Sequence, residues 1–224
     1  MRFWQIIVTV FALFTSISAS AQSVEISAIY VDDNGDETET RSDFNGQAPL
    51  SVSFRANPMD MEGLEPTYEW HFRMEGESKD MMVRYEENTD YTFTKAGKTF
   101  ITLYANLGNE EVVSSQICVT ISESKLTMPN AFSPNDDGHN DIYKAKEYQS
   151  IVEFHAYIFN RWGQKLYEWT DPAGEWDGTY NGKVVKDGTY FLLVKAKGAD
   201  GREYNIRKDV NVLTGFTEGN RLNN

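Results

Sequence analysis

The chain has few of the features that would cross-link it, anchor it in a membrane or give it positive charge. Its 224 residues contain one cysteine, Cys118, and 21 Lys and Arg against 34 Asp and Glu, so the formal net charge is −13. A single cysteine excludes an internal disulfide. Nucleic acids and anionic membrane surfaces repel an acidic protein, so we expect neither as a partner.

Motifs for catalysis are also missing. The three histidines, His71, His139 and His155, are far apart and do not have the spacing of metal ligands. The chain has no nucleophile elbow, no Walker loop and no His-Glu-x-x-His motif. We therefore predict that the protein is not an enzyme and has no catalytic residue.

One apolar run stands out, and it lies at the beginning of the chain. Arg2 precedes an apolar stretch over residues 6–14, and Ala19-Ser20-Ala21 fits the small-x-small rule for signal-peptide cleavage. The run is too short to span a bilayer comfortably. We expect a signal peptide over residues 1–21, Sec export through the periplasm, and a mature chain without a membrane span.

Helix signals are nearly absent, and apolar residues alternate with polar ones as they do in half-buried strands. Alternation runs through SVEISAIYV, LSVSFRA, TYEWHF and KTFITLYANL, stops near Ser122, and resumes in IVEFHAYIFNRWG, KVVKDGTYFLLVKAKGADG and REYNIRKDVNVL. Turn residues such as Asn34-Gly35 separate the segments. The pattern predicts an all-β protein with two tandem immunoglobulin-like β-sandwiches, residues 22–123 and 124–214, then a polar tail over 215–224. A short linker between them would leave their relative orientation open.

The segment PNAFSPNDDGHND, at the start of the second half, has two interpretations. Asn135, Asp137 and Asp141 can be laid on positions three, five and nine of an EF-hand-like loop, with Gly138 at the sharp turn. A serine and a lysine then fall at positions one and twelve, and the lysine opposes a cation. Asparagine and aspartate are equally good turn residues. The segment is therefore either a calcium site at Asn135, Asp137 and Asp141 or a structural turn.

Aromatic residues suggest two further sites. Arg161 and Trp162 in FNRWG can form a cation–π pair on a hairpin, which is either a rigid turn or a recognition edge for a partner. Trp169 and Trp176 flank TDPAGE, and an exposed pair of this kind could stack on sugar rings as a glycan platform. In the alternative interpretation, Trp176 anchors a turn in which Asp177 binds backbone amides.

The first half resembles a PKD-type immunoglobulin-like module in APLSVSFRA, in YEWHF around Trp70, and in YTFTKAGKTFITLYANLG. It departs from that family where RMEG replaces the usual Gly-Asp-Gly after the tryptophan motif. The resemblance implies a sandwich with Trp70 in its core that acts as a spacer or as a protein-binding module.

The second half resembles the gliding motility-associated C-terminal domain of Bacteroidetes, the type-B cargo domain of the type IX secretion system. The resemblance rests on PNAFSPNDDGHND, IFNRWGQKLYE, WDG and VVKDGTYFLLV, which occur in this order over about 85 residues. It implies a seven-stranded sandwich that is read by the type IX translocon or by an outer-membrane accessory protein. The family typically ends at its last strand, whereas this chain continues for about eleven residues.

Together these features predict a non-enzymatic protein that is secreted or held at the cell surface. The alternative is a carbohydrate-binding or adhesive surface protein whose partner is a glycan or another surface protein.

Overall fold

The computed structural model describes residues 22–61, 63–108 and 112–215. All regular structure in these residues is β-strand. No helix long and apolar enough to cross a membrane occurs within them. The predicted signal peptide and most of the predicted polar tail lie outside the described residues.

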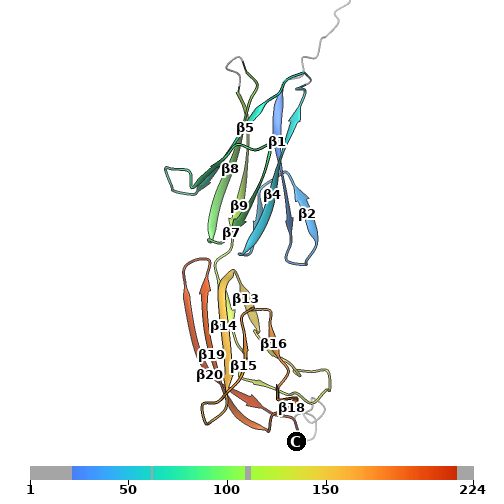
Figure 1. Ribbon diagram of the computed structural model, residues 1–224, viewed down its shortest axis with the longest axis vertical. Coiled ribbons are helices and arrows are strands. Elements are labelled where there is room, and N and C mark those ends of the chain that lie inside the picture. Colours follow the sequence, from blue (N-terminus) through green and yellow to red (C-terminus); the bar gives the residue numbers. More distant parts are fainter. Residues whose placement is uncertain (1–21, 62, 109–111, 216–224) are drawn as a thin grey trace, which may run out of the picture.

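The first sandwich consists of a four-stranded and a five-stranded sheet (Figure 1). The four-stranded sheet contains, in spatial order, β2 (Glu37–Thr40), β1 (Ser23–Val31), β4 (Leu50–Met59) and β7 (Asn88–Phe93). The five-stranded sheet contains β3 (Phe44–Gly46), β9 (Val112–Ile121), β8 (Gly97–Asn106), β5 (Thr67–Met74) and β6 (Met82–Arg84).

The core of this sandwich follows from the alternation in its strands. In β4 from Leu50 to Ala56, and in β8 from Thr99 to Ala105, every second side chain is buried and points at the opposite sheet. Trp70 of β5 is fully buried, and its indole N–H donates to the Glu86 carbonyl over 2.9 Å. A buried Trp must satisfy its N–H in this way, and the predicted position of Trp70 in the core is confirmed.

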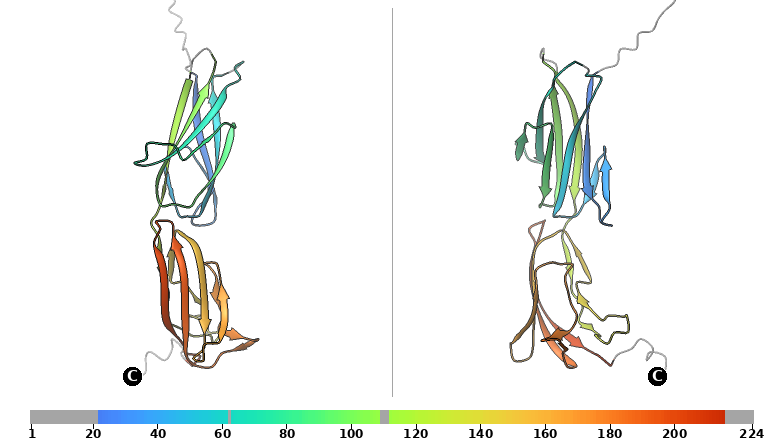
Figure 2. Two further views of the ribbon diagram at one scale, coloured as in Figure 1. Left: turned by 60° about the vertical axis from the view of Figure 1, so that its left-hand side comes forward. Right: turned by 45° about the vertical axis from the view of Figure 1, so that its right-hand side comes forward.

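The second sandwich sets one five-stranded sheet against short strand pairs (Figure 2). The large sheet contains β11 (Ala131–Phe132), β20 (Glu203–Val212), β19 (Gly188–Gly198), β14 (Ile151–Phe159) and β15 (Lys165–Trp169). The pairs are β10 (Lys125–Thr127) with β13 (Glu147–Gln149), β12 (Tyr143–Lys144) with β16 (Glu175–Trp176), and β17 (Thr179–Tyr180) with β18 (Lys183–Val184). Side chains of both layers form a core separate from that of the first sandwich. The predicted fold class, two tandem immunoglobulin-like sandwiches, is confirmed.

The two sandwiches are stacked end to end and are hydrogen-bonded where they meet (Figure 1). Ala199, at the tip of the β19–β20 hairpin, is 8% exposed and packs against the core of the first sandwich. Its carbonyl accepts from the Ala96 amide over 3.0 Å, and the hydroxyl of Ser150 accepts from the Ala48 amide over 3.2 Å. These contacts favour one orientation, whereas the linker alone would leave the orientation open.

Charge is divided unequally between the two sandwiches. Residues 22–123 contain seven Lys and Arg against 20 Asp and Glu, a net charge of −13. Residues 124–215 contain twelve Lys and Arg against 13 Asp and Glu, a net charge of −1. The acidic character of the chain therefore belongs to the first sandwich, and the second presents comparable numbers of both charges.

Candidate functional site

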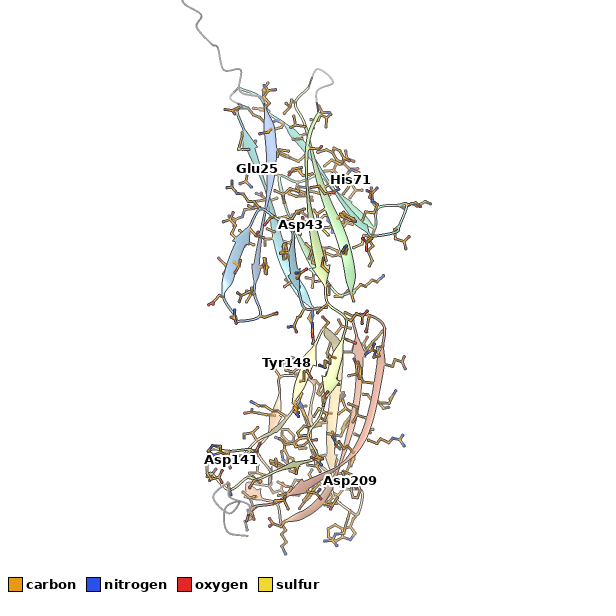
Figure 3. The ribbon with its side chains drawn as sticks, turned by 180° about the vertical axis from the view of Figure 1, so that it is seen from behind. Glu25, Asp43, His71, Asp141, Tyr148 and Asp209 are labelled. Carbon is orange, nitrogen blue, oxygen red and sulfur yellow. The ribbon has the colours of Figure 1, made fainter. Side chains whose placement is uncertain are left out.

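The loop between β11 and β12 is organised around the carboxylate of Asp141 (Figure 3). Its Oδ1 accepts from the amides of Asn135 over 3.0 Å and Asp136 over 2.8 Å, and its Oδ2 accepts from the Gly138 amide over 2.8 Å. Desolvation raises the pKa of Asp141, but the hydrogen bonds from these amides and from that of Asp137 together lower it more, so the pKa lies below its ordinary value.

The ends of the loop are fixed in the core of the second sandwich. Phe132 and Tyr143 are buried, with ring centroids 5.5 Å apart. The Tyr143 hydroxyl donates to the Pro129 carbonyl over 2.8 Å, and burial raises the pKa of this phenol. Gly138 has a φ of +83°, which a glycine adopts without strain.

This geometry supports the structural-turn interpretation of the loop. Both oxygens of Asp141 already accept amide hydrogen bonds, two at Oδ1 and one at Oδ2, so the carboxylate is engaged in holding the turn. The described residues contain no group of three or more His, Cys, Asp or Glu that could hold a metal ion. Calcium binding by Asn135, Asp137 and Asp141 stays a prediction.

The β14–β15 hairpin presents the predicted cation–π pair to solvent. Trp162 is 79% exposed, and the guanidinium carbon of Arg161 lies 5.0 Å from the centroid of its ring. The Asn160 side chain fixes the turn, because its Oδ1 accepts from the amides of Trp162 and Gln164, each over 3.0 Å. A rigid, exposed Trp–Arg pair suits recognition of a partner, since both residue types are enriched in binding hot spots.

The other two tryptophans predicted as binding residues are buried. Trp169 is 7% exposed and Trp176 is fully inaccessible, so the exposed aromatic pair expected for sugar stacking is not formed. The Trp176 indole N–H donates to the Thr179 carbonyl over 3.0 Å, and Asp177 accepts from the Thr179 amide over 2.8 Å. Trp176 therefore anchors a turn, as in the alternative interpretation.

A surface that the sequence analysis missed covers the outer face of the five-stranded sheet. On β14, the rings of His155 and Tyr157 stack with centroids 4.2 Å apart, and Tyr157 and Phe159 follow at 6.1 Å. Phe159 lies opposite Phe191 of β19, which is 43% exposed. Leu193 continues this apolar strip on β19. Aromatic residues on the outward positions of IVEFHAYIF were the signal that could have revealed it.

A groove of about 700 Å³ lies over this strip and reaches β20. Its floor is formed by Phe159, Phe191 and Leu193, and Arg207 and Asp209 of β20 also line it. The groove therefore combines an apolar floor with charged groups of both signs, as a binding surface for a polypeptide does.

The three histidines lie on different elements of the structure. In the first sandwich, Nδ1 of His71 lies 2.6 Å from Asp80 and its Nε2 lies 3.0 Å from Glu69. His155 lies on the outer face of the second sandwich, and His139 in the Asp141 loop. Two carboxylates around His71 hold the ring in place on the sheet surface.

Comparison with known proteins supports the interpretation of the second sandwich. Residues 126–208 match the family model of the CHU_C type IX secretion signal domain. The matched stretch begins in β10 and ends in β20, so it covers most of that sandwich. No curated protein matches the chain.

Several solved structures are similar to the chain at low identity. Fibronectin(III)-like modules of Clostridium thermocellum CbhA are 14% identical, with 77% of this chain and 89% of that chain covered and a TM-score of 0.26. SGBP-B of Bacteroides ovatus, in complex with a mixed-linkage heptasaccharide, is 14% identical, with 81% of this chain and 45% of that chain covered and a TM-score of 0.29. Dimeric latent PorU of Porphyromonas gingivalis is 13% identical, with 85% of this chain and 20% of that chain covered and a TM-score of 0.27.

These low TM-scores give no information about function. The match of residues 126–208 to a type IX secretion signal domain indicates a secreted or cell-surface protein.

Proposed function

We propose that the protein is a non-enzymatic cargo of a type IX secretion system, carried across the outer membrane by its second sandwich. The observation that carries this proposal is the match to the type IX secretion signal domain, because it covers most of that sandwich and none of the first. The partner is the translocon or an outer-membrane accessory protein, and the exposed pair of Arg161 and Trp162 belongs to the surface offered to it.

The first sandwich is then the passenger, a PKD-like spacer or protein-binding module. Its net charge of −13 and its end-to-end contact with the second sandwich suit a module that stands away from an anionic outer membrane.

Deletion of residues 124–224 tests the role of the second sandwich. In the native host, the truncated chain is expected to accumulate in the periplasm, because the segment that matches the secretion signal is gone. Immunoblots of periplasm, cell surface and medium measure the distribution. A matched chain that lacks residues 24–121 and keeps the second sandwich should still be exported. Normal export of the chain that lacks residues 124–224 would disprove the proposal.

The glycan-binding alternative loses its main support in the structure. It depended on an exposed pair of rings at Trp169 and Trp176, and both are buried. Trp162 is exposed, but it stands on a hairpin tip with Arg161 stacked against its ring. Secretion is therefore the function that the observations favour.

A further inference from the structure

Strand β20 lies at the margin of the five-stranded sheet and is mostly unpaired on its outer side (Figures 1 and 2). It pairs with β19 without interruption from Glu203 to Val212. On the other side, β11 pairs only with Asn211 and Val212. Within the described part of the chain, residues 203–209 therefore have no strand partner on that side.

The direction of the unpaired backbone groups follows from two hydrogen bonds. The Asn211 amide donates to the Asn130 carbonyl, away from β19, and the Arg202 carbonyl accepts from the Gly198 amide, toward β19. Backbone groups alternate in direction along an antiparallel strand. The N–H and C=O groups of Glu203, Asn205, Arg207 and Asp209 thus all point outward, and they span about 20 Å at a rise of about 3.4 Å per residue.

This edge lacks two of the devices that prevent unwanted pairing and has a third, charged side chains. Proteins protect edges with prolines and bulges, and β20 contains neither. It carries charges of both signs instead, Glu203 and Asp209 on either side of Arg207. Such a pattern disfavours an arbitrary strand and accepts one with matching charges.

Two cations beside the edge have no carboxylate partner within the part of the chain that the structure describes. Lys195 of β19 lies opposite Asn205, and Arg207 lies opposite Leu193, so the cations are diagonal neighbours on the outer face. Diagonal neighbours in a sheet are about 7–8 Å apart, close enough to repel each other. Neither cation forms an ion pair with any other described residue. Glu203 and Asp209 on the same face offset part of this repulsion, and a carboxylate placed beside Arg207 at the edge would remove more of it.

We propose that the open edge of β20 binds an extended segment of a partner protein as an added strand. The segment carries a carboxylate beside Arg207 and a large apolar side chain that enters the groove over Phe159, Phe191 and Leu193. The inference rests on the proposed function, because it identifies this edge as the surface by which the export machinery recognises the second sandwich.

Two other occupants fit the edge less well. Near the end of the described residues, Thr214 lies on the β19 side of the sheet, because its amide and hydroxyl donate to Asp187, which directly precedes β19, over 3.0 and 2.6 Å. A second copy could pair antiparallel around Asn205, with Glu203 opposite Arg207 of the other copy. That register pairs only residues 203–207 and brings no apolar side chain to the groove.

Two substitutions in the full chain test the edge. Asn205→Pro removes an N–H that points outward, so it blocks an added strand without removing a bond to β19. Arg207→Glu reverses the charge that the partner carboxylate requires. Lys183→Glu makes the same charge change on the exposed strand β18 and is the matched control. The two edge variants should each reduce the exported fraction about tenfold in the native host, and the control should be exported normally.

The outcomes separate the inference from the proposed function. Far-UV circular dichroism and melting curves of the purified variants show whether they fold. If Asn205→Pro does not fold, the export of Arg207→Glu alone decides the test. Normal export of both folded edge variants, with export still abolished by deletion of residues 124–224, overturns the inference and leaves the proposed function standing. Export of the deleted chain overturns the proposed function itself. If the purified parent chain is dimeric and the Asn205→Pro variant is monomeric, the edge binds a second copy of this chain, and the proposed partner is wrong.

Discussion

Trp169 and Trp176 provide a direct test of the interpretation that both are structural. Both rings are buried in the second sandwich, but their indole N–H groups differ. The Trp176 N–H donates to Thr179, whereas the Trp169 N–H has no hydrogen-bond partner among the described residues. Replacement of each Trp by Phe keeps an aromatic ring and removes the N–H.

The two replacements should differ in cost. In Trp176→Phe, a partly buried carbonyl loses its donor, which costs about 1–3 kcal/mol, and the smaller ring adds about 1 kcal/mol. We expect a loss of about 2–4 kcal/mol in the free energy of unfolding. In Trp169→Phe, removal of an unsatisfied N–H gains back about 1–3 kcal/mol and the smaller ring costs about 1 kcal/mol, so the free energy of unfolding should be unchanged or rise by up to about 2 kcal/mol.

Urea denaturation of the full chain, followed by circular dichroism, measures both changes. The transition of the second sandwich should shift to lower urea in Trp176→Phe with an unchanged slope, and should stay in place or shift to higher urea in Trp169→Phe. Equal losses in the two variants, or a larger loss in Trp169→Phe, would refute the reasoning from their hydrogen bonds.

Three further predictions concern the junction, the Asp141 loop and the cysteine. Gly198→Ala should lower the stability of the full chain by about 1–3 kcal/mol in urea, because its Cβ would overlap Ser124; an unchanged midpoint would argue against the close contact. Since the folded pKa of Asp141 lies below its ordinary value of 3.8, its carboxylate stabilises the fold above about pH 4 and this contribution is lost as the pH falls through the lowered pKa. Melting temperatures of Asp141→Asn should therefore fall less between about pH 5 and pH 2 than those of the parent, and parallel curves would contradict this. Burial raises the pKa of Cys118, so a thiol reagent at pH 8 should label it slowly in the folded chain and rapidly in urea; equal rates would contradict this burial.

The sequence predicted the fold well because strand alternation is a local signal. Residues 50–56 alternate apolar and polar side chains, and β4 buries one face accordingly. Trp70 could be placed in the core for the same reason. The contacts between the sandwiches were not predictable, since Ala199 and Ser150 look like ordinary turn residues until the tertiary structure places them beside the first sandwich.

The candidate site was predicted less completely. The cation–π pair of Arg161 and Trp162 on a hairpin tip is confirmed, because a short Gly-containing turn between two strands exposes its central residues, and partner binding by this pair stays a prediction. The expected exposure of Trp169 is wrong, because its ring packs against Phe154 with centroids 6.2 Å apart, a tertiary contact that the local sequence does not encode. The open edge of β20 depends on which strands become neighbours, and the sequence does not contain that information locally.

The most direct test of the proposed export role is the fate of a reporter fused to the second sandwich. A periplasmic reporter with a Sec signal peptide, followed by residues 124–224, should appear at the cell surface or in the medium of the native host. The same reporter without residues 124–224 should remain in the periplasm. Retention of the fused reporter in the periplasm, although it is folded and intact, would contradict the account.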